Sequence, residues 1–377
     1  MVVMTHPLLF FISRLIVIYF ILLLCGVVAC CVVNQSNYRG EDKTSATPNT
    51  DFMERWLLVA TCVWLYLCLL IMNIGEYNEA KPALVSQSSL PHGYTKRPFI
   101  HKYYRLNHTF VDCFKSIFVL HNETVNIWSH IIGFFIWLHM YIQCAESEAY
   151  TKADYLTQSI IQVSYIFCIL MPLFSSLYHT FNASTTCCYF SICYRQGGFS
   201  SPDNPTERSP LNLAERIFLR LDLLGILSLW FSRVLLEGHL VWWCERDVFT
   251  NLLLLSIAAF LICSPIVLYN VNVKGFGPLF LVVHIPIVSM TISLLWTSYE
   301  SSVLLYMCYS VSGTICAFVA FYIYANKIPE VYKPGQYDLF GHSHNYWHFF
   351  TWLGPTLVLI GFDHMLNYRV LSGFQCK

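Results

Sequence analysis

The sequence predicts an all-α polytopic membrane protein, a seven-transmembrane-helix bundle preceded by two extra hydrophobic segments. Hydrophobic residues make up 56% of the 377 residues and charged residues only 12%, with a mean hydropathy of +0.52. A soluble domain has roughly 25% charged residues. The chain also contains a series of apolar runs, each close to the ~20 residues that a helix needs to cross a bilayer.

Seven of the apolar runs form a continuous series from Val125 onwards, and we interpret them as the core spans. They lie at Val125–Cys144, Ser159–His179, Ile217–Leu236, Val248–Asn270, Gly277–Trp296, Val303–Ala325 and Tyr346–Met365. Two earlier runs lie at Leu15–Val33 and Trp56–Ile74. We interpret Leu15–Val33 as a retained span, because a signal peptide usually has an apolar region of only about 7–15 residues. A cleaved signal sequence and a wrongly assigned start of the chain remain alternatives.

These runs divide the chain into four parts. Residues 1–90 form an N-terminal extension with the two early spans, and residues 125–366 form the seven-helix core. Between them, residues 91–124 interleave aromatic and basic side chains, which suits an amphipathic helix at the cytosolic membrane surface. Residues 367–377 form a short extracellular or lumenal tail.

The distribution of Lys and Arg predicts the orientation of the core. Thirteen of these residues fall on the side of the membrane where the first core span begins. Only five fall on the opposite side: Lys152, Arg233, Arg246, Arg369 and Lys377. By the positive-inside rule, the core begins in the cytosol and ends outside the cell or in an organelle lumen.

The charge balance and the cysteines exclude other classes. The formal net charge is zero, so the chain has no bulk attraction to nucleic acid. The sixteen cysteines are mostly scattered singly through apolar runs and show no CxxC pair. We therefore expect neither a disulfide framework nor a cysteine zinc site.

Three polar fragments lie at the edges of long apolar runs, where ionisable groups are costly and usually functional. They are Ser175-Ser-Leu-Tyr-His179, Leu221-Asp222-Leu-Leu-Gly225 and His344-Asn-Tyr-Trp-His348. Residues four apart on a helix share a face, so the two ends of the first fragment point the same way, as do those of the third. The predicted topology places all three fragments on the cytosolic side. Because three imidazoles are a common zinc set with a fourth position left open, the fragments predict one metal site.

Five motifs in order resemble the progestin and adipoQ receptor family. Besides the three fragments, they are Asn122-Glu-Thr-Val-Asn-Ile-Trp-Ser-His130 and Ile328-Pro-Glu-Val-Tyr-Lys-Pro-Gly335. The resemblance runs from about Gly93 to the last helix and is adiponectin-receptor-like. The short tail and the run from Pro334 to Gly341 favour the Golgi-resident branch of the family.

The resemblance implies seven helices, an intracellular N-terminus and a Zn²⁺ ion bound by three histidines. Matched motif by motif, the zinc ligands are His179, His344 and His348. Asp222 corresponds to the residue that holds a zinc-bound water, and Ser175 lies beside it as a support or substrate contact. Two features depart from the family pattern, the long connection Phe181–Arg216 and the two early spans. A retained intron would also explain the long connection.

We expect a membrane receptor or signalling regulator at the plasma membrane or the Golgi. Its partner is a membrane lipid or other hydrophobic ligand, a protein hormone, or a cytosolic signalling protein. One alternative is a zinc-dependent lipid amide hydrolase similar to a ceramidase, in which Asp222 and Ser175 are catalytic. A purely structural zinc remains open beside it. Another alternative is a Golgi-anchored scaffold that holds a cytosolic kinase through Pro91–Thr124.

Overall fold

The computed structural model describes residues 82–90, 94, 96–183, 213–269, 284–290, 292, 301–372 and 376. The predicted early spans, Leu15–Val33 and Trp56–Ile74, lie outside these residues. Most of the long connection and most of the predicted span Gly277–Trp296 also lie outside them.

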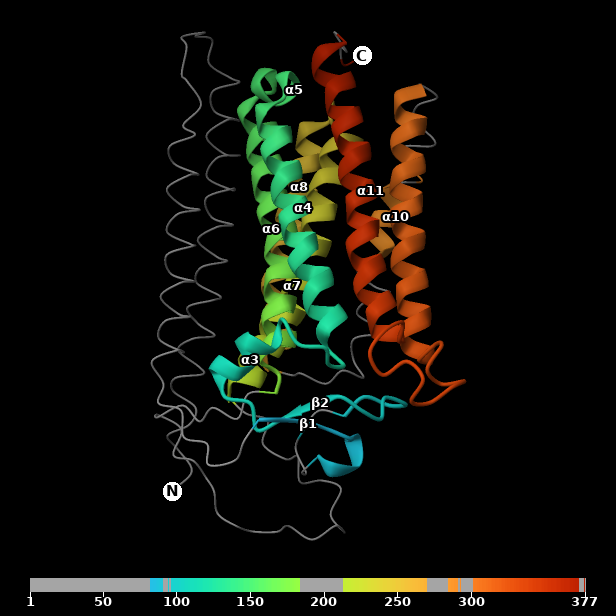
Figure 1. Ribbon diagram of the computed structural model, residues 1–377. Helices are drawn as coiled ribbons and strands as arrows, with labels where there is room; N and C mark the ends of the chain where they lie inside the picture. The colour runs from blue at the N-terminus through green and yellow to red at the C-terminus, as the bar shows by residue number, and fades with distance from the viewer. Residues whose placement is uncertain are drawn as a thin grey trace.

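Every other predicted core span falls on a long helix, and these helices run side by side in one bundle (Figure 1). They are α4 (Thr124–Glu146), α6 (Tyr155–Phe181), α7 (Leu213–Val241), α8 (Arg246–Tyr269), α10 (Ser301–Asn326) and α11 (Ser343–Leu371). Among the described residues, five helices are long and apolar enough to cross a membrane, and α7 is not one of them. The chain is therefore a mostly helical, multi-pass membrane protein, as the sequence predicts.

Helix α7 differs from its neighbours because polar residues interrupt its apolar surface. Its 29 residues include Asp222, Arg233 and Glu237. The count of basic residues above places Arg233 on the outer side, although the residue falls within the predicted span Ile217–Leu236. The residue lies inside the helix with a side chain only 10% exposed, so it does not contribute to the loop charge.

The helices approach closely where glycine replaces a larger side chain. A Cβ atom on Gly225 of α7 would lie 3.0 Å from Cα of Met171 on α6. A Cβ atom on Gly313 of α10 would lie 2.7 Å from the carbonyl oxygen of Gly354 on α11. Small residues at helix contacts bring membrane helices together in this way. Helix α6 is the most buried of the five candidate spans, with 72% of its apolar window covered, and it packs against α4 and α7.

One end of the bundle, which we call the hairpin end, is covered by the segment that precedes α4 (Figure 1). Strand β1 (Ala83–Val85) is followed by a 3₁₀ turn (Gln87–Ser89) and pairs antiparallel with β2 (Tyr104–Leu106). The short helix α3 (Phe110–Ser116) follows, and a capping box between Thr109 and Asp112 starts it.

Before α4 begins at Thr124, the described part of Pro91–Thr124 is helical only over the seven residues of α3, and not along a long amphipathic helix. The backbone explains the difference, because Phe99, Tyr103 and Asn107 have φ values of 65°, 65° and 57°. Such left-handed conformations interrupt a right-handed helix. The mixture of apolar and basic side chains therefore belongs to a folded cover and not to one continuous helix.

The opposite end of the bundle, which we call the disulfide end, carries the short helix α5 (Glu148–Lys152) and the C-terminus (Figure 1). Cys244, just after α7, forms a disulfide with Cys376, which is 132 residues away in the chain. This single pair differs from the expectation that the cysteines form no disulfide framework. Sequence spacing gives no sign of it, since the pair forms only because α7 and α11 both end here.

Candidate metal centre

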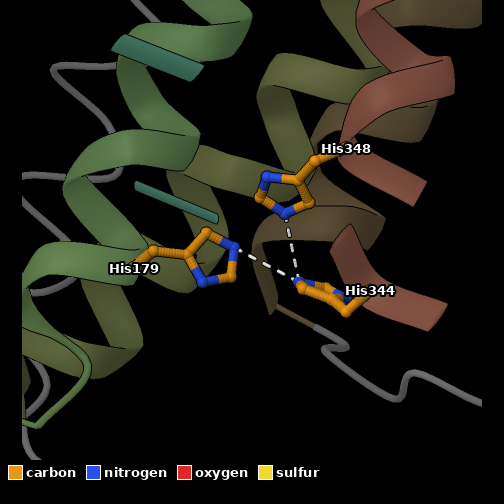
Figure 2. Close-up of side chains that lie close together, drawn as sticks. All are labelled: His179, His344 and His348. Carbon is orange, nitrogen blue, oxygen red and sulfur yellow. Dashed lines mark hydrogen bonds between the residues drawn. The ribbon is translucent and has the colours of Figure 1, made fainter. Parts of the chain in front are cut away.

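Three histidine side chains converge at the hairpin end of the bundle (Figure 2). His179 lies in the last turn of α6, and His344 and His348 lie in the first turns of α11. The Nε2 atom of His344 is 3.3 Å from Nε2 of His179 and 3.1 Å from Nε2 of His348. The structure thus brings together the three histidines that the sequence matched to zinc ligands.

The geometry of this group fits a small divalent metal ion. Zinc–nitrogen bonds of about 2.0–2.1 Å at tetrahedral angles place two ligand nitrogens about 3.4 Å apart. The two Nε2 separations are close to that value, and one ligand atom from each of the three rings lies within 4.8 Å of the others. Within the described residues the group contains three protein ligands, which matches a site with a fourth position for water or substrate.

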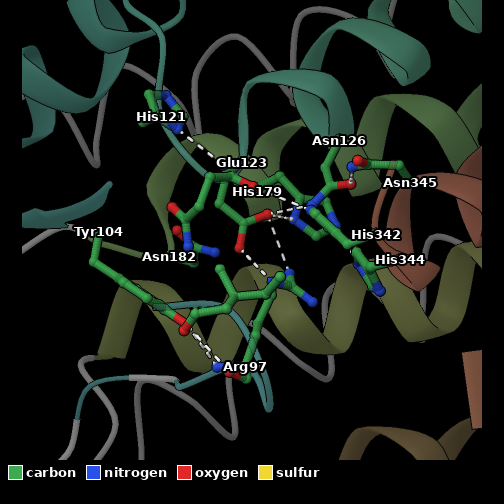
Figure 3. Close-up of polar contacts among 12 residues, drawn as sticks. Arg97, Tyr104, His121, Glu123, Asn126, His179, Asn182, His342, His344 and Asn345 are labelled. Carbon is green, nitrogen blue, oxygen red and sulfur yellow. Dashed lines mark hydrogen bonds and ion pairs between the residues drawn. The ribbon is translucent and has the colours of Figure 1, made fainter. Parts of the chain in front are cut away.

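His179 is held by a carboxylate on its far side, that of Glu123 (Figure 3). The Nδ1 atom of His179 lies 2.9 Å from Oε2 of Glu123, the residue before the first turn of α4. A proton on Nδ1 leaves the lone pair of Nε2 directed at the histidine group. Carboxylates commonly orient metal-binding histidines in this way.

Arg97, in the segment that covers the hairpin end, contacts His179 through Glu123. Its Nε and Nη2 donate hydrogen bonds to the two oxygens of Glu123 at 2.8 and 3.1 Å. Burial alone would raise the pKa of Glu123, but the charge of Arg97 and the hydrogen bonds from Arg97 and His179 hold that pKa well below its ordinary value. Glu123 therefore remains a carboxylate that accepts from both sides. Sequence reasoning missed both residues, although Glu123 stands inside the motif that begins at Asn122.

The start of α4 also supports the second helix of the site, α11. Asn126 donates to Glu123 at 2.5 Å and accepts from Asn345 at 2.7 Å. The hydroxyl oxygen of Ser129 lies 3.3 Å from Nδ1 of His348, and the ring of the buried His130 lies beside that of His348, tilted, with 4.1 Å between centroids. These residues belong to the motif Asn122–His130, so the motif forms one wall of the histidine group.

The loop before α11 fixes the start of that helix. The carboxylate of Glu330 accepts from the backbone N–H of Ser343 at 2.7 Å and from its hydroxyl group. His342 lies next to this contact but outside the histidine group, with Nε2 3.4 Å from the carbonyl oxygen of Asn122. Burial, followed by the nearby charge of Arg97, lowers the pKa of His342 to about 4.

Arg105 of β2 fixes the end of α6 that carries His179. Its guanidinium donates to the carbonyl oxygens of His179 at 2.6 Å and Thr180 at 2.8 Å, and to the side chains of Asn182 and Ser116. The last carbonyl groups of a helix lack partners within the helix, and a buried cation satisfies them here. The segment before α4 is therefore part of the support of the site.

Asp222 and Ser175 lie beside the histidines without joining them. Ser175 is buried one turn before His179 on α6, within hydrogen-bonding reach of the Asp222 carboxyl group on α7. Asp222 is also close enough to His179 for the two side chains to interact electrostatically. The close contact of Gly225 with α6 brings this part of α7 near the site. The arrangement would let Asp222 hold a water molecule near a bound metal ion.

A cavity begins next to these residues and extends towards the disulfide end. Its volume is about 100 Å³, several times what one water molecule needs. It lies between α7, α10 and α11, and its lining begins at Leu223 and Trp347, which are neighbours in sequence of Asp222 and His348. The lining is mostly apolar, with Arg233, Ser232 and His284 as its main polar contributors.

A family model covers most of the helical bundle and the residues of the histidine group. The model described as "Haemolysin-III related" matches residues 118–194 and 208–359, more than half of the chain. The chain belongs to this haemolysin-III-related, progestin and adipoQ receptor family. The matched residues include every histidine of the metal centre as well as Asp222 and Ser175.

Similar proteins in plants, fungi and animals carry names of this family. Heptahelical transmembrane protein 3 of Arabidopsis thaliana is 26% identical over 328 residues, covering 78% of this chain and 92% of that protein. Progestin and adipoQ receptor family member 3 of Mus musculus is 24% identical over 306 residues, covering 74% and 87%. ADIPOR-like receptor IZH2 of Saccharomyces cerevisiae is 25% identical over 312 residues, covering 77% and 87%.

The two departures from the family pattern coincide with the limits of the match. The gap at residues 195–207 falls inside the long connection Phe181–Arg216, and the match begins only at residue 118. The two early hydrophobic segments precede it. The family model therefore does not match the middle of the long connection or the two early segments.

Proposed function

We propose that the protein is a seven-helix membrane receptor or signalling regulator that binds a hydrophobic ligand beside an intramembrane Zn²⁺ ion. The observation that carries this proposal is an apolar cavity whose lining includes Leu223 and Trp347, the sequence neighbours of Asp222 and His348. A lipid or another hydrophobic molecule suits a cavity with this lining. The names of the relatives, which include adiponectin and progestin receptors, support a receptor role.

We further propose that the zinc site lies near the cytosolic face and that the C-terminus is extracellular or lumenal. Disulfides persist mainly in oxidising compartments, and Cys244–Cys376 lies at the end of the bundle away from the histidines. The excess of Lys and Arg at the hairpin end supports the same orientation. The plasma membrane and the Golgi both fit it, as does a protein hormone outside or a signalling protein in the cytosol.

Filling the cavity tests the ligand proposal. Ala317 on α10 lines the cavity, whereas Val319 on the same helix is exposed on the outer surface of the bundle. We expect Ala317→Trp to weaken binding of a fluorescent fatty acid to the purified protein by about tenfold or more while the zinc content is unchanged. Val319→Trp, the matched control, should bind like the wild type. Undiminished binding by Ala317→Trp would contradict the proposal.

A second candidate function is hydrolysis of a lipid amide such as ceramide. It is favoured by the position of Asp222, which lies beside His179 but is not part of the ligand group. A zinc ion bound there would lower the pKa of a bound water molecule. Asp222 would hold that water and take up its proton, Ser175 would hold the Asp222 carboxyl group, and the apolar cavity would take an acyl chain. This chemistry is compatible with a receptor that also processes its ligand.

A further inference from the structure

Arg233 is a cation inside the membrane-embedded part of α7. It lies eleven residues after Asp222, which corresponds to a rise of about 16 Å along the helix. Its side chain is only 10% exposed and that of its neighbour Glu237 only 1%. Charged groups at such positions are costly and usually mark a functional site.

The charge of Arg233 is balanced by a neighbouring carboxylate, and two of its nitrogens donate hydrogen bonds. Its Nε donates to Glu237, one helical turn away on α7. Its Nη2 donates to the Ser310 carbonyl oxygen at 2.9 Å and to the Thr314 hydroxyl at 2.6 Å, both on α10. The hydroxyl of Ser310 in turn donates to Glu237 at 3.2 Å. The pair therefore has almost no net charge and joins α7 to α10.

Arg233 also lies in the wall of the cavity. Arg233 contributes to the cavity lining together with the neighbouring Ser232 and Leu236. The hydrogen bonds to described residues use Nε and Nη2, and no described residue accepts from Nη1. The cavity wall thus runs from Leu223, next to Asp222, to Arg233, whose Nη1 has no acceptor among the described residues.

We propose that Arg233 donates a hydrogen bond to an uncharged oxygen at the far end of the bound ligand. This inference rests on the proposed function, because it specifies the ligand of the same cavity. A hydroxyl or carbonyl group fits better than an anion, since Glu237 already balances the charge of Arg233. The ligand class is therefore an elongated hydrophobic molecule with a polar group at each end.

Two ligands that differ only at the far end test the proposal. The zinc-loaded full-length protein in nanodiscs is titrated with myristate and with ω-hydroxymyristate. We expect the ω-hydroxy compound to bind about tenfold tighter, as a hydrogen bond to a charged donor provides. A hydroxyl in the middle of the chain should not tighten binding. Equal affinity for myristate and its ω-hydroxy derivative would overturn the proposal, and this comparison needs no variant.

A double variant tests whether the Arg233–Glu237 pair causes the preference for ω-hydroxymyristate over myristate. Arg233→Met together with Glu237→Leu replaces both charges by apolar side chains, a change that is often tolerated. It should bind both ligands with equal affinity and keep the wild-type zinc content. A preference that persists in this variant would show that the pair only joins α7 to α10. Failure of the wild type to bind either compound would refute the proposed function as well.

Discussion

Replacing Glu123 should weaken metal binding without touching a metal ligand. In the structure Glu123 gives His179 two things, an acceptor for Nδ1 at 2.9 Å and a negative charge. Glu123→Gln keeps an acceptor but removes the charge, whereas Glu123→Ala removes both. Comparing the two variants therefore separates two effects of Glu123 on metal binding: how it orients the His179 ring and how its charge raises the basicity of that ring.

The expected magnitudes follow from this difference. Loss of a group that orients a metal ligand typically lowers metal affinity 10–100-fold. We expect about tenfold for Glu123→Gln and about 100-fold for Glu123→Ala, or about 1.4 and 2.7 kcal/mol. Glu123→Gln also leaves the cation of Arg97, whose side chain is 14% exposed, without its counter-charge. That loss should cost about 3–5 kcal/mol of folding free energy.

Competition of the purified protein with a chromophoric chelator for zinc measures these affinities. The double variant Arg97→Met/Glu123→Gln removes the unpaired cation, so it should recover stability but keep the weaker zinc binding. Glu148→Gln is the control, because Glu148 pairs with Lys152 on the surface at the disulfide end. Wild-type zinc affinity in both Glu123→Gln and Glu123→Ala would refute the assigned role of this carboxylate.

Three further outcomes are expected from other parts of the molecule. Asp222→Asn should keep the zinc and reduce any ceramide hydrolysis by about 10²–10⁴-fold, with a milder effect of Ser175→Ala, and equal turnover in Asp222→Asn would exclude the amidase. An epitope tag after Cys376 should be reachable without permeabilising the membrane from the extracellular or lumenal side, and cytosolic accessibility would reverse the orientation. Asp154→Ala should lower the free energy of unfolding by about 1–2 kcal/mol, because Asp154 caps α6 through the N–H of Thr157 at 2.7 Å. Asp154→Asn should keep most of that cap, so an equal loss in both variants would assign the effect to the ion pair with Arg246.

The helices and the three histidines could be predicted because both follow local rules. Apolar runs of membrane length identify spans, and the four-residue spacing of His344 and His348 places them on one face of α11. His179 could be added because the order of the motifs and the parity of the crossings bring it to the same end. These rules need no knowledge of how the helices pack.

The support of the site could not be predicted because it depends on tertiary contacts. Arg97 and Glu123 are 26 residues apart, and Glu123 and His179 are 56 residues apart, without any periodic pattern to connect them. Arg105 belongs to the basic side chains of residues 91–124 that the sequence predicts at the membrane surface, yet it is buried against the end of α6. The disulfide joins Cys244 to Cys376 for the same reason, since only the packed bundle brings them together.

The zinc content of the purified protein tests the central claim most directly. We predict about one zinc ion per chain, and a lower content in each of His179→Ala, His344→Ala and His348→Ala. His342→Ala and His139→Ala should keep the wild-type content, because His342 lies outside the group and His139 is exposed on α4. A wild-type protein without zinc, or five variants that all behave alike, would contradict the three-histidine metal centre.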